Sequence, residues 1–187
     1  MGQRPTVISI AAVSGGGKTT ITKHLVSEFS SAKALYFDNY LFDEYPSDSC
    51  TNIDTGVTDD EWVLTSFISD LQTLLHISPS LDYIFLDYPF AYLHEAMKQY
   101  IDLAVYIDTP LDIAMARRIR RDFKDCSIAE IHDYVLHYET YGRTAYLESI
   151  HSVKPNSDII IDGTFSASVI TKQLVEEIKQ RKLAKRL

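Results

Sequence analysis

The stretch Ala12-Val-Ser-Gly-Gly-Gly-Lys-Thr19 decides the fold of this 187-residue chain. It follows Thr6–Ala12, which is β-branched and almost continuously apolar, as a strand buried on both faces must be. It opens Thr19–Phe29, in which apolar residues recur near helical spacing. A glycine-rich turn ending in Lys-Thr between a strand and a helix is typical of a phosphate-binding loop, and only Ala12, in place of the first glycine, departs from the Walker A pattern.

The composition of this loop suits a nucleoside triphosphate. Its three consecutive glycines allow successive N–H groups to point at phosphate oxygens, and the following helix adds its positive end. Lys18 can reach the β- and γ-phosphates, and the Thr19 hydroxyl can bind Mg²⁺. The alternative, a flexible turn beside a surface lysine, does not explain the strand and helix on either side. We expect the nucleotide to bind Ser14, Gly15, Gly16, Gly17, Lys18, Thr19 and Thr20.

Composition bounds the class of protein. Lys+Arg number 18 and Asp+Glu 26, a formal net charge of −8, which disfavours a protein that coats nucleic acid. With 45% hydrophobic and 24% charged residues, the chain is predicted to form one globular domain over residues 1–187. Cys50 and Cys126 form no disulfide or zinc pattern. Since no apolar run could span a bilayer or serve as a signal peptide, we expect a cytoplasmic protein that contacts no membrane.

Strand-like and helix-like segments alternate along the rest of the chain, which is typical of a parallel sheet covered by helices. The four further predicted strands are Ala34–Phe37, Tyr83–Leu86, Leu103–Ile107 and Asp158–Ile161. Helices are predicted behind the capping box Thr58-Asp-Asp-Glu61, from Pro110 through an arginine cluster, over Ile128–Ile150 and from Ser166 onward. The pattern therefore predicts an α/β fold with a five-stranded parallel sheet and helices on both faces, and a long loop over residues 39–57.

Three carboxylates follow predicted strands, where doubly wound sheets bind ligands. Asp38 is predicted to be the general base that takes the proton of an acceptor hydroxyl, and Asp87 to be the acid that holds Mg²⁺ with Thr19. Asp108, which precedes Thr-Pro, is interpreted as a residue that caps the following turn. The alternative for Asp38 and Asp87 is such a capping role alone.

A helix predicted after Pro110 carries four arginines, Arg117, Arg118, Arg120 and Arg121. Surface arginines are commonly only solvated. Four of the 18 basic residues fall within five positions of this acidic chain, however, and phosphoryl transfer needs cations that close over the developing charge. The cluster therefore predicts a phosphate-closing lid over about residues 117–145.

Together these residues resemble the uridine kinase and phosphoribulokinase group of P-loop kinases, most closely its uridine/cytidine kinase branch. The resemblance covers nearly the whole chain and is carried by Ile8–Thr20, Phe37-Asp-Asn-Tyr40, Asn52-Ile-Asp54, Ile84–Asp87 and Ala116-Arg-Arg-Ile-Arg-Arg-Asp122. It implies a three-layer P-loop NTPase fold with a small helical lid. It also implies transfer of the γ-phosphate of ATP, with Mg²⁺, to a hydroxyl of a small molecule, in the first place a nucleoside.

Carried over residue by residue, the resemblance implies that Asp38 is the catalytic base and that Asp54 grips the acceptor sugar hydroxyls. It implies that Arg118 contacts the acceptor and that Arg121 contacts the phosphates. Lys18 and Arg121 are then expected to spread the charge of transfer. Tyr40 and Tyr92 belong to an aromatic set that could stack a heterocyclic acceptor or could equally fill the core, and we assign both to the acceptor site.

The chain also departs from the pattern of that group. Thr55-Gly56 replaces His-Pro, Tyr88-Pro89 replaces a glycine-led turn, and Lys124 and Cys126 stand where nucleoside kinases carry additional arginine. Kinases of nicotinamide riboside or pantothenate therefore remain alternatives. A nucleotide-dependent ATPase or switch is the alternative from another class. A nucleoside-monophosphate kinase is disfavoured because residues 38–61 are acidic and would repel a second phosphate.

Overall fold

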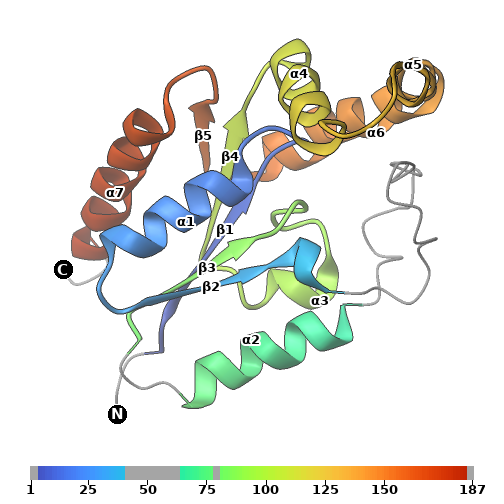
Figure 1. The fold of residues 1–187 in the computed structure, drawn as a ribbon. Coiled ribbons are helices and arrows are strands. Elements are labelled where there is room, and N and C mark those ends of the chain that lie inside the picture. The colour runs from blue at the N-terminus through green and yellow to red at the C-terminus, as the bar shows by residue number, and fades with distance from the viewer. Residues whose placement is uncertain (1–3, 41–63, 78–80, 185–187) are drawn as a thin grey trace.

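The computed structural model describes residues 4–40, 64–77 and 81–184. Their centre is one five-stranded sheet in the order β2-β3-β1-β4-β5, in which every strand pair is parallel (Figure 1). The strands are β1 (Thr6–Ala11), β2 (Ala32–Tyr36), β3 (Tyr83–Asp87), β4 (Leu103–Asp108) and β5 (Ile159–Asp162). The predicted five-stranded parallel sheet is confirmed.

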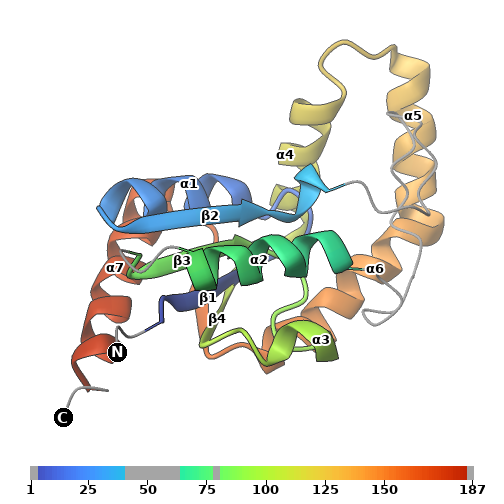
Figure 2. The same ribbon diagram turned by 90° about the horizontal axis from the view of Figure 1, so that it is seen from below.

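Helices cover both faces of this sheet, as predicted (Figures 1 and 2). One face packs against α1 and α7, and the other packs against α2, α3 and the segment that leads into β5. The helices are α1 (Lys18–Glu28), α2 (Thr65–Ile77), α3 (Glu95–Lys98), α4 (Leu111–Asp122), α5 (Ile128–His137), α6 (Arg143–Glu148) and α7 (Ala167–Ala184).

The central strand β1 shows why its sequence is almost continuously apolar. Ile8 and Ile10 point into the layer beneath α1 and α7, whereas Val7 and Ala11 point into the opposite layer. All four side chains are fully buried. At about 25 cal/mol per Å² of apolar surface, such a strand is stable only when helices cover both of its faces.

The strand register brings the predicted acidic residues to the edge that carries the phosphate loop. Asp87 of β3 lies beside Ile10 of β1 on one side and beside Tyr36 of β2 on the other. The 3₁₀ turn Phe37–Asn39 continues directly from β2 and contains Asp38. Because the strands are parallel, their carboxyl ends share this edge with the loop that leaves β1.

A helical arm formed by α4, α5 and α6 projects beyond this edge (Figure 2). The predicted helix Ile128–Ile150 is less regular than its sequence suggests, because π-helical segments at 138–142 and 149–153 interrupt it. In the first of them the Thr140 hydroxyl donates to the Leu136 carbonyl at 2.8 Å, a type of contact that competes with the backbone hydrogen bonds of a helix.

The helix predicted behind Thr58 also differs from its prediction. Leu64 is not helical, and α2 begins at Thr65, where the Ile68 N–H donates to the Leu64 carbonyl. The capping box 58–61 lies outside the described residues, as do Asp54 and Cys50. Within the described parts of the chain, no helix is both long and apolar enough to cross a membrane.

Candidate active site

The glycine-rich turn adopts a backbone that only glycine accommodates readily. Gly15 has φ of 77° and Gly17 has φ of 105°. A Cβ on Gly15 would lie 2.2 Å from the Ala114 carbonyl oxygen of α4, so the loop packs directly against the arm. Inside the turn the Gly16 N–H donates to the Val13 carbonyl at 2.9 Å. These constraints explain the three glycines of the motif.

Two side chains at the start of α1 face the end of this turn and the neighbouring strand. The Lys18 ammonium lies 3.5 Å from the Ala12 carbonyl, folded back over the loop. The Thr19 hydroxyl donates to Asp87 Oδ2 at 2.5 Å and so connects the start of α1 to the end of β3. Ser14 and Thr20 are half-buried and exposed, respectively, at the two ends of the loop.

A cavity of about 180 Å³ lies between α1 and the ends of β2 and β3. It contains three residues that the sequence assigned separately to metal binding and to proton transfer, Thr19, Asp38 and Asp87. Lys23, Tyr36 and Asn39 complete its lining. The predicted metal residues and the predicted base thus share one cavity beside the phosphate loop.

Asp87 is the buried acid of this cavity, with 1% of its surface exposed. Burial raises the pKa of its carboxyl group, and the nearby negative charge of Asp38 acts in the same direction. The Lys18 charge and the Thr19 hydrogen bond oppose this increase but do not cancel it. A cation placed at Asp87 would therefore be attracted by a carboxylate that its surroundings leave incompletely neutralised.

The groups around Asp87 fit a Mg²⁺ ion. Asp87 Oδ1 is buried and has no hydrogen-bond partner in the described chain, and the Thr19 hydroxyl is the second oxygen donor beside it. Mg²⁺ prefers oxygen ligands and is commonly held by one or two protein groups together with phosphate oxygens. Among the described residues no cluster of three His, Cys, Asp or Glu side chains could hold a metal alone, so the nucleotide would have to supply further ligands.

The arginines of α4 divide into a buried one and exposed ones. Arg118 is 7% exposed, donates to the Tyr146 hydroxyl at 3.0 Å and lies over the Tyr134 ring. It therefore joins α4 to the rest of the arm, and its assignment to the acceptor stays a prediction.

Arg121 is exposed and forms a two-pronged contact with Asp122, at 2.5 and 2.9 Å. That contact is the main cause of a raised pKa of Arg121, and the charge of Asp38 adds to it. Arg121 thus lies within electrostatic range of Asp38, although its guanidinium is occupied by Asp122. The side of the guanidinium that holds Asp122 can therefore bind a phosphate oxygen only if this contact opens.

The two tyrosines assigned to the acceptor site, Tyr40 and Tyr92, lie in different parts of the structure. Tyr40 packs on Phe67 with its ring centroid 5.0 Å away, and its hydroxyl donates to Asp70 of α2. Tyr92 donates to Asp158, which also accepts the Ala104 N–H, at the amino ends of β4 and β5. Because this is the edge of the sheet opposite the phosphate loop, the Tyr92 hydroxyl does not reach the cavity. We therefore correct its assignment and remove Tyr92 from the candidate acceptor site.

Asp108 also differs from its interpretation as a capping residue. Its carboxylate accepts from the Lys154 ammonium at 2.6 Å and so ties the end of β4 to the segment before β5. Sequence reasoning missed Lys23 as well, although its position one helical turn after Thr19 is a usable signal. Lys23 is exposed, and its charge also lowers the pKa of Asp87.

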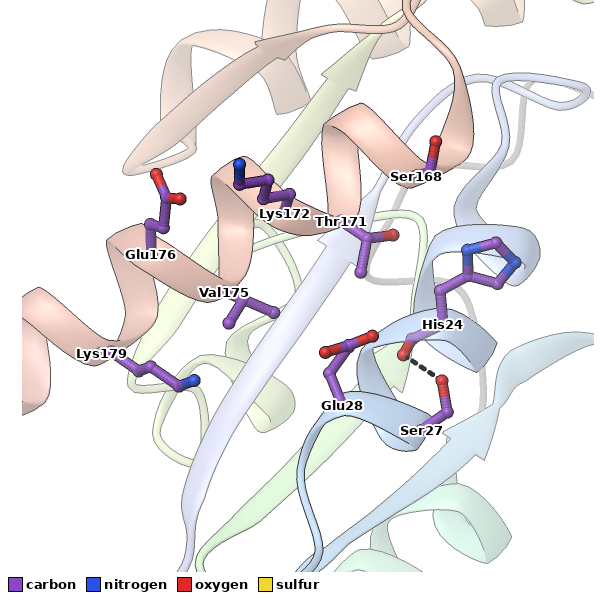
Figure 3. A pocket seen from close by; sticks show the side chains of 9 residues that line it. All are labelled: His24, Ser27, Glu28, Ser168, Thr171, Lys172, Val175, Glu176 and Lys179. Atoms are coloured by element: carbon purple, nitrogen blue, oxygen red, sulfur yellow. Dashed lines mark hydrogen bonds between the residues drawn. The ribbon is translucent and has the colours of Figure 1, made fainter.

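A larger hollow of about 580 Å³ lies on the outer surface between α1 and α7 (Figure 3). Its walls mix both signs of charge, including His24, Glu28, Lys172 and Glu176, and its floor includes Val175. It contains none of the residues that the sequence assigned to chemistry. The smaller cavity beside the phosphate loop is therefore the candidate active site.

Comparisons with known proteins relate this chain to one family of enzymes. A family model described as "Phosphoribulokinase / Uridine kinase family" matches residues 79–175. Uridine kinase from Bacillus subtilis (strain 168) is 26% identical over 186 residues, covering 86% of this chain and 87% of that protein. Uridine kinase from Leuconostoc citreum (strain KM20) is 25% identical over 210 residues, covering 96% of this chain and all of that protein.

Solved structures support the fold. An unliganded sugar kinase from Janibacter sp. HTCC2649 has a TM-score of 0.58 with this chain and covers 94% of it, with 95% of that chain matched. An uncharacterized protein from Eubacterium ventriosum gives a TM-score of 0.55. Sequence identities of 12% and 11% mean that these likenesses concern the fold alone.

Proposed function

The chain belongs to the phosphoribulokinase / uridine kinase family, and from this premise we propose that it transfers the γ-phosphate of ATP to a hydroxyl of a nucleoside. Enzymes of this kind are small-molecule kinases, and the uridine kinases from Bacillus subtilis and Leuconostoc citreum match 86% and 96% of the chain, respectively. Uridine is accordingly the first acceptor to test. The single observation that carries the proposal is the cavity shared by Thr19, Asp38 and Asp87 next to the glycine-rich turn.

Within this cavity we assign the steps of transfer to named atoms. The N–H groups of the glycine-rich turn and the Lys18 ammonium would bind the β- and γ-phosphates and hold the nucleotide in place. The carboxylate of Asp38 would accept the proton of the acceptor hydroxyl as its oxygen attacks the γ-phosphorus. The attacking oxygen and the leaving oxygen must lie roughly in line, which a base on one side and the phosphate loop on the other would favour.

Mg²⁺ would be held by the Thr19 hydroxyl and the Asp87 carboxylate together with phosphate oxygens, and when bound it neutralises charge on those oxygens. In the free protein the Thr19 hydroxyl already donates to Asp87. That hydrogen bond keeps the two donors adjacent before any ligand arrives, which lowers the cost of assembling the site. The unpartnered Asp87 Oδ1 is the atom left for the ion or for a water bound to it.

Closure of the arm formed by α4, α5 and α6 would bring further positive charge to the phosphates. Arg121 would exchange its contact with Asp122 for a phosphate oxygen, since both are bidentate partners of a guanidinium. Arg118 is the anchor in this scheme, because its buried contact with Tyr146 holds α4 against the rest of the arm. The arm therefore supplies one mobile cation and one fixed one.

The decisive test of the function is ADP formation with a panel of acceptors, namely uridine, cytidine, nicotinamide riboside, pantothenate and no acceptor. We expect ADP to form only when an acceptor is present and fastest with a pyrimidine nucleoside. A preference for nicotinamide riboside or pantothenate would support the assignment as a kinase but contradict a nucleoside of the uridine type as its acceptor. Equal rates with and without any acceptor would replace the kinase by an ATPase.

The raised pKa of Asp87 leads to a prediction about stability. A carboxyl group whose pKa is raised on folding contributes stability below its unfolded pKa, and this contribution is lost as the pH rises through the folded pKa. At pH 7 Asp87→Asn is therefore expected to raise Tm of the free protein by about 2–4 °C, the shift that ~1 kcal/mol produces in a chain of this size.

The same substitution removes the charge proposed to attract Mg²⁺. We expect the Asp87→Asn variant to lose most of the additional thermal stabilisation that Mg²⁺ gives in the presence of ATP. Melting curves with ATP alone, with ATP and Mg²⁺, and with ATP and EDTA measure this difference. A lower Tm for the free variant at pH 7 would mean that the buried charge is stabilising, against the direction of the pKa shift.

A further inference from the structure

A hydroxyl outside every sequence motif reaches into the phosphate loop. Thr109 follows β4, is 3% exposed, and donates its hydroxyl proton to the Gly16 carbonyl oxygen at 2.9 Å. The bond is buried and joins residues 93 positions apart in the sequence. A buried hydrogen bond to a backbone carbonyl fixes the orientation of the peptide group to which that carbonyl belongs.

The peptide between Gly16 and Gly17 is therefore held in one orientation. In a planar trans peptide the carbonyl and the following N–H point in opposite directions. Because Thr109 holds the Gly16 carbonyl on the buried side, the Gly17 N–H points away from Thr109. That N–H makes no hydrogen bond to any other described residue, and a Cβ on Gly17 would meet nothing within 4 Å. Within the part of the chain that the structure describes, this N–H is thus a donor without an acceptor, at a glycine with open space beside it.

The Thr109 hydroxyl is itself confined by the turn after β5. A Cβ on Gly163 would lie 1.9 Å from Thr109 Oγ1, so the glycine backbone packs directly on the hydroxyl. The Gly163 N–H donates to the Asp108 carbonyl at 2.9 Å, which holds this turn against the end of β4. The hydroxyl has little room to turn away from Gly16. Such confinement is what allows one side chain to orient another group in advance.

We propose that Thr109 is a positioning residue of the phosphate loop, whose hydroxyl aims the Gly17 N–H at a phosphate oxygen of the nucleotide. This inference rests on the proposed function for its ligand, a nucleoside triphosphate. Two adjacent glycines rotate easily about their backbone bonds, so a peptide between them needs an outside anchor to stay in one orientation. Thr109 supplies that anchor from a neighbouring strand without touching the ligand.

The test compares Thr109→Val, which keeps the shape and removes the donor, with Thr109→Ser, which keeps the donor. Thr22→Val is the matched control, because Thr22 is also fully buried and its hydroxyl has no partner in the described chain. We expect Kd for ATP and for inorganic tripolyphosphate to rise about tenfold in Thr109→Val, as for a lost oriented donor. In Thr109→Ser and Thr22→Val both constants should stay within about twofold of wild type. Binding is measured by calorimetry well below Tm.

A purely structural role would give a different result, namely a lower Tm for Thr109→Val with unchanged Kd for ATP and tripolyphosphate, and it would overturn the proposal. If Thr109→Val does not fold, an NMR experiment on the wild-type protein tests the proposal instead. Its Gly17 amide proton should shift in the NMR spectrum on addition of tripolyphosphate and not of adenosine, and an unshifted amide would overturn the proposal. These measurements of binding need no acceptor. If the protein binds ATP but phosphorylates no acceptor, the proposed function is contradicted, and the binding constants still test the role of Thr109.

Discussion

Replacing Asp38 by Asn is expected to lower kcat about a thousandfold, within the usual range for loss of a general base. The reason is the position of Asp38 in the cavity that also contains Thr19 and Asp87, beside the phosphate loop, where we propose that the acceptor hydroxyl binds. The amide of Asn has nearly the same shape but cannot take the proton. Since the change does not touch the glycine-rich turn, ATP should still bind within about twofold of its wild-type Kd. Steady-state kinetics with saturating acceptor and calorimetry with ATP measure the two quantities.

A matched control for this experiment is Asp125→Asn. The side chain of Asp125 is 85% exposed and pairs only loosely with Lys124, at 3.7 Å. The Asp125→Asn substitution removes the same charge from a site outside the cavity, so kcat should stay within about twofold of the wild-type value. A fall in kcat for Asp38→Asn that is no larger than in this control would rule out Asp38 as the base.

Lys18→Ala is expected to have the second largest effect. Lys18 is the one lysine of the glycine-rich turn, and its ammonium is already folded over the loop at 3.5 Å from the Ala12 carbonyl. Without it the β- and γ-phosphates lose a charged partner, and we expect kcat/KM for ATP to fall by about 10²–10³. The effect should appear in binding and in transfer together, because the charge contacts the phosphates in both states.

Thermal melting gives a second readout for the same variant. At about a hundredfold excess over Kd, ATP should stabilise the wild-type protein by ~2.7 kcal/mol, or about 5–10 °C in Tm. For Lys18→Ala this shift should nearly vanish, whereas Lys98→Ala should retain it, since Lys98 pairs with Glu95 on the outer surface of α3. An undiminished shift in Lys18→Ala would argue against a triphosphate in the loop.

Much of the fold could be predicted because its three inner strands, β1, β3 and β4, are buried on both faces. Such strands are short and continuously apolar, as in β1, and the rule that ligands bind at carboxyl ends then placed Asp38 and Asp87 correctly at one edge. The arm was harder to predict. Its helical spacing is visible in the sequence, but the π-helical segments at 138–142 and 149–153 follow no sequence pattern that we recognise.

Contacts between distant parts of the chain could not be predicted in the same way. Thr109 belongs to the site only because the end of β4 lies beside the phosphate loop, which no local pattern reveals. For Tyr92 the prediction was wrong in the opposite direction. Its aromatic ring suited a stacking role in the acceptor site, but its hydroxyl donates to Asp158 at the amino ends of the strands. Side-chain type predicts which chemistry is possible, whereas the topology determines which groups meet.

The most direct test of the central claim follows the labelled γ-phosphate of ATP when the protein is incubated with Mg²⁺ and uridine. If one cavity brings the terminal phosphate and an acceptor hydroxyl together, the label should appear in a nucleoside monophosphate and should do so only while Asp38 is intact. Label that appears solely as inorganic phosphate, at a rate that neither the panel of acceptors nor Asp38→Asn changes, would contradict the account.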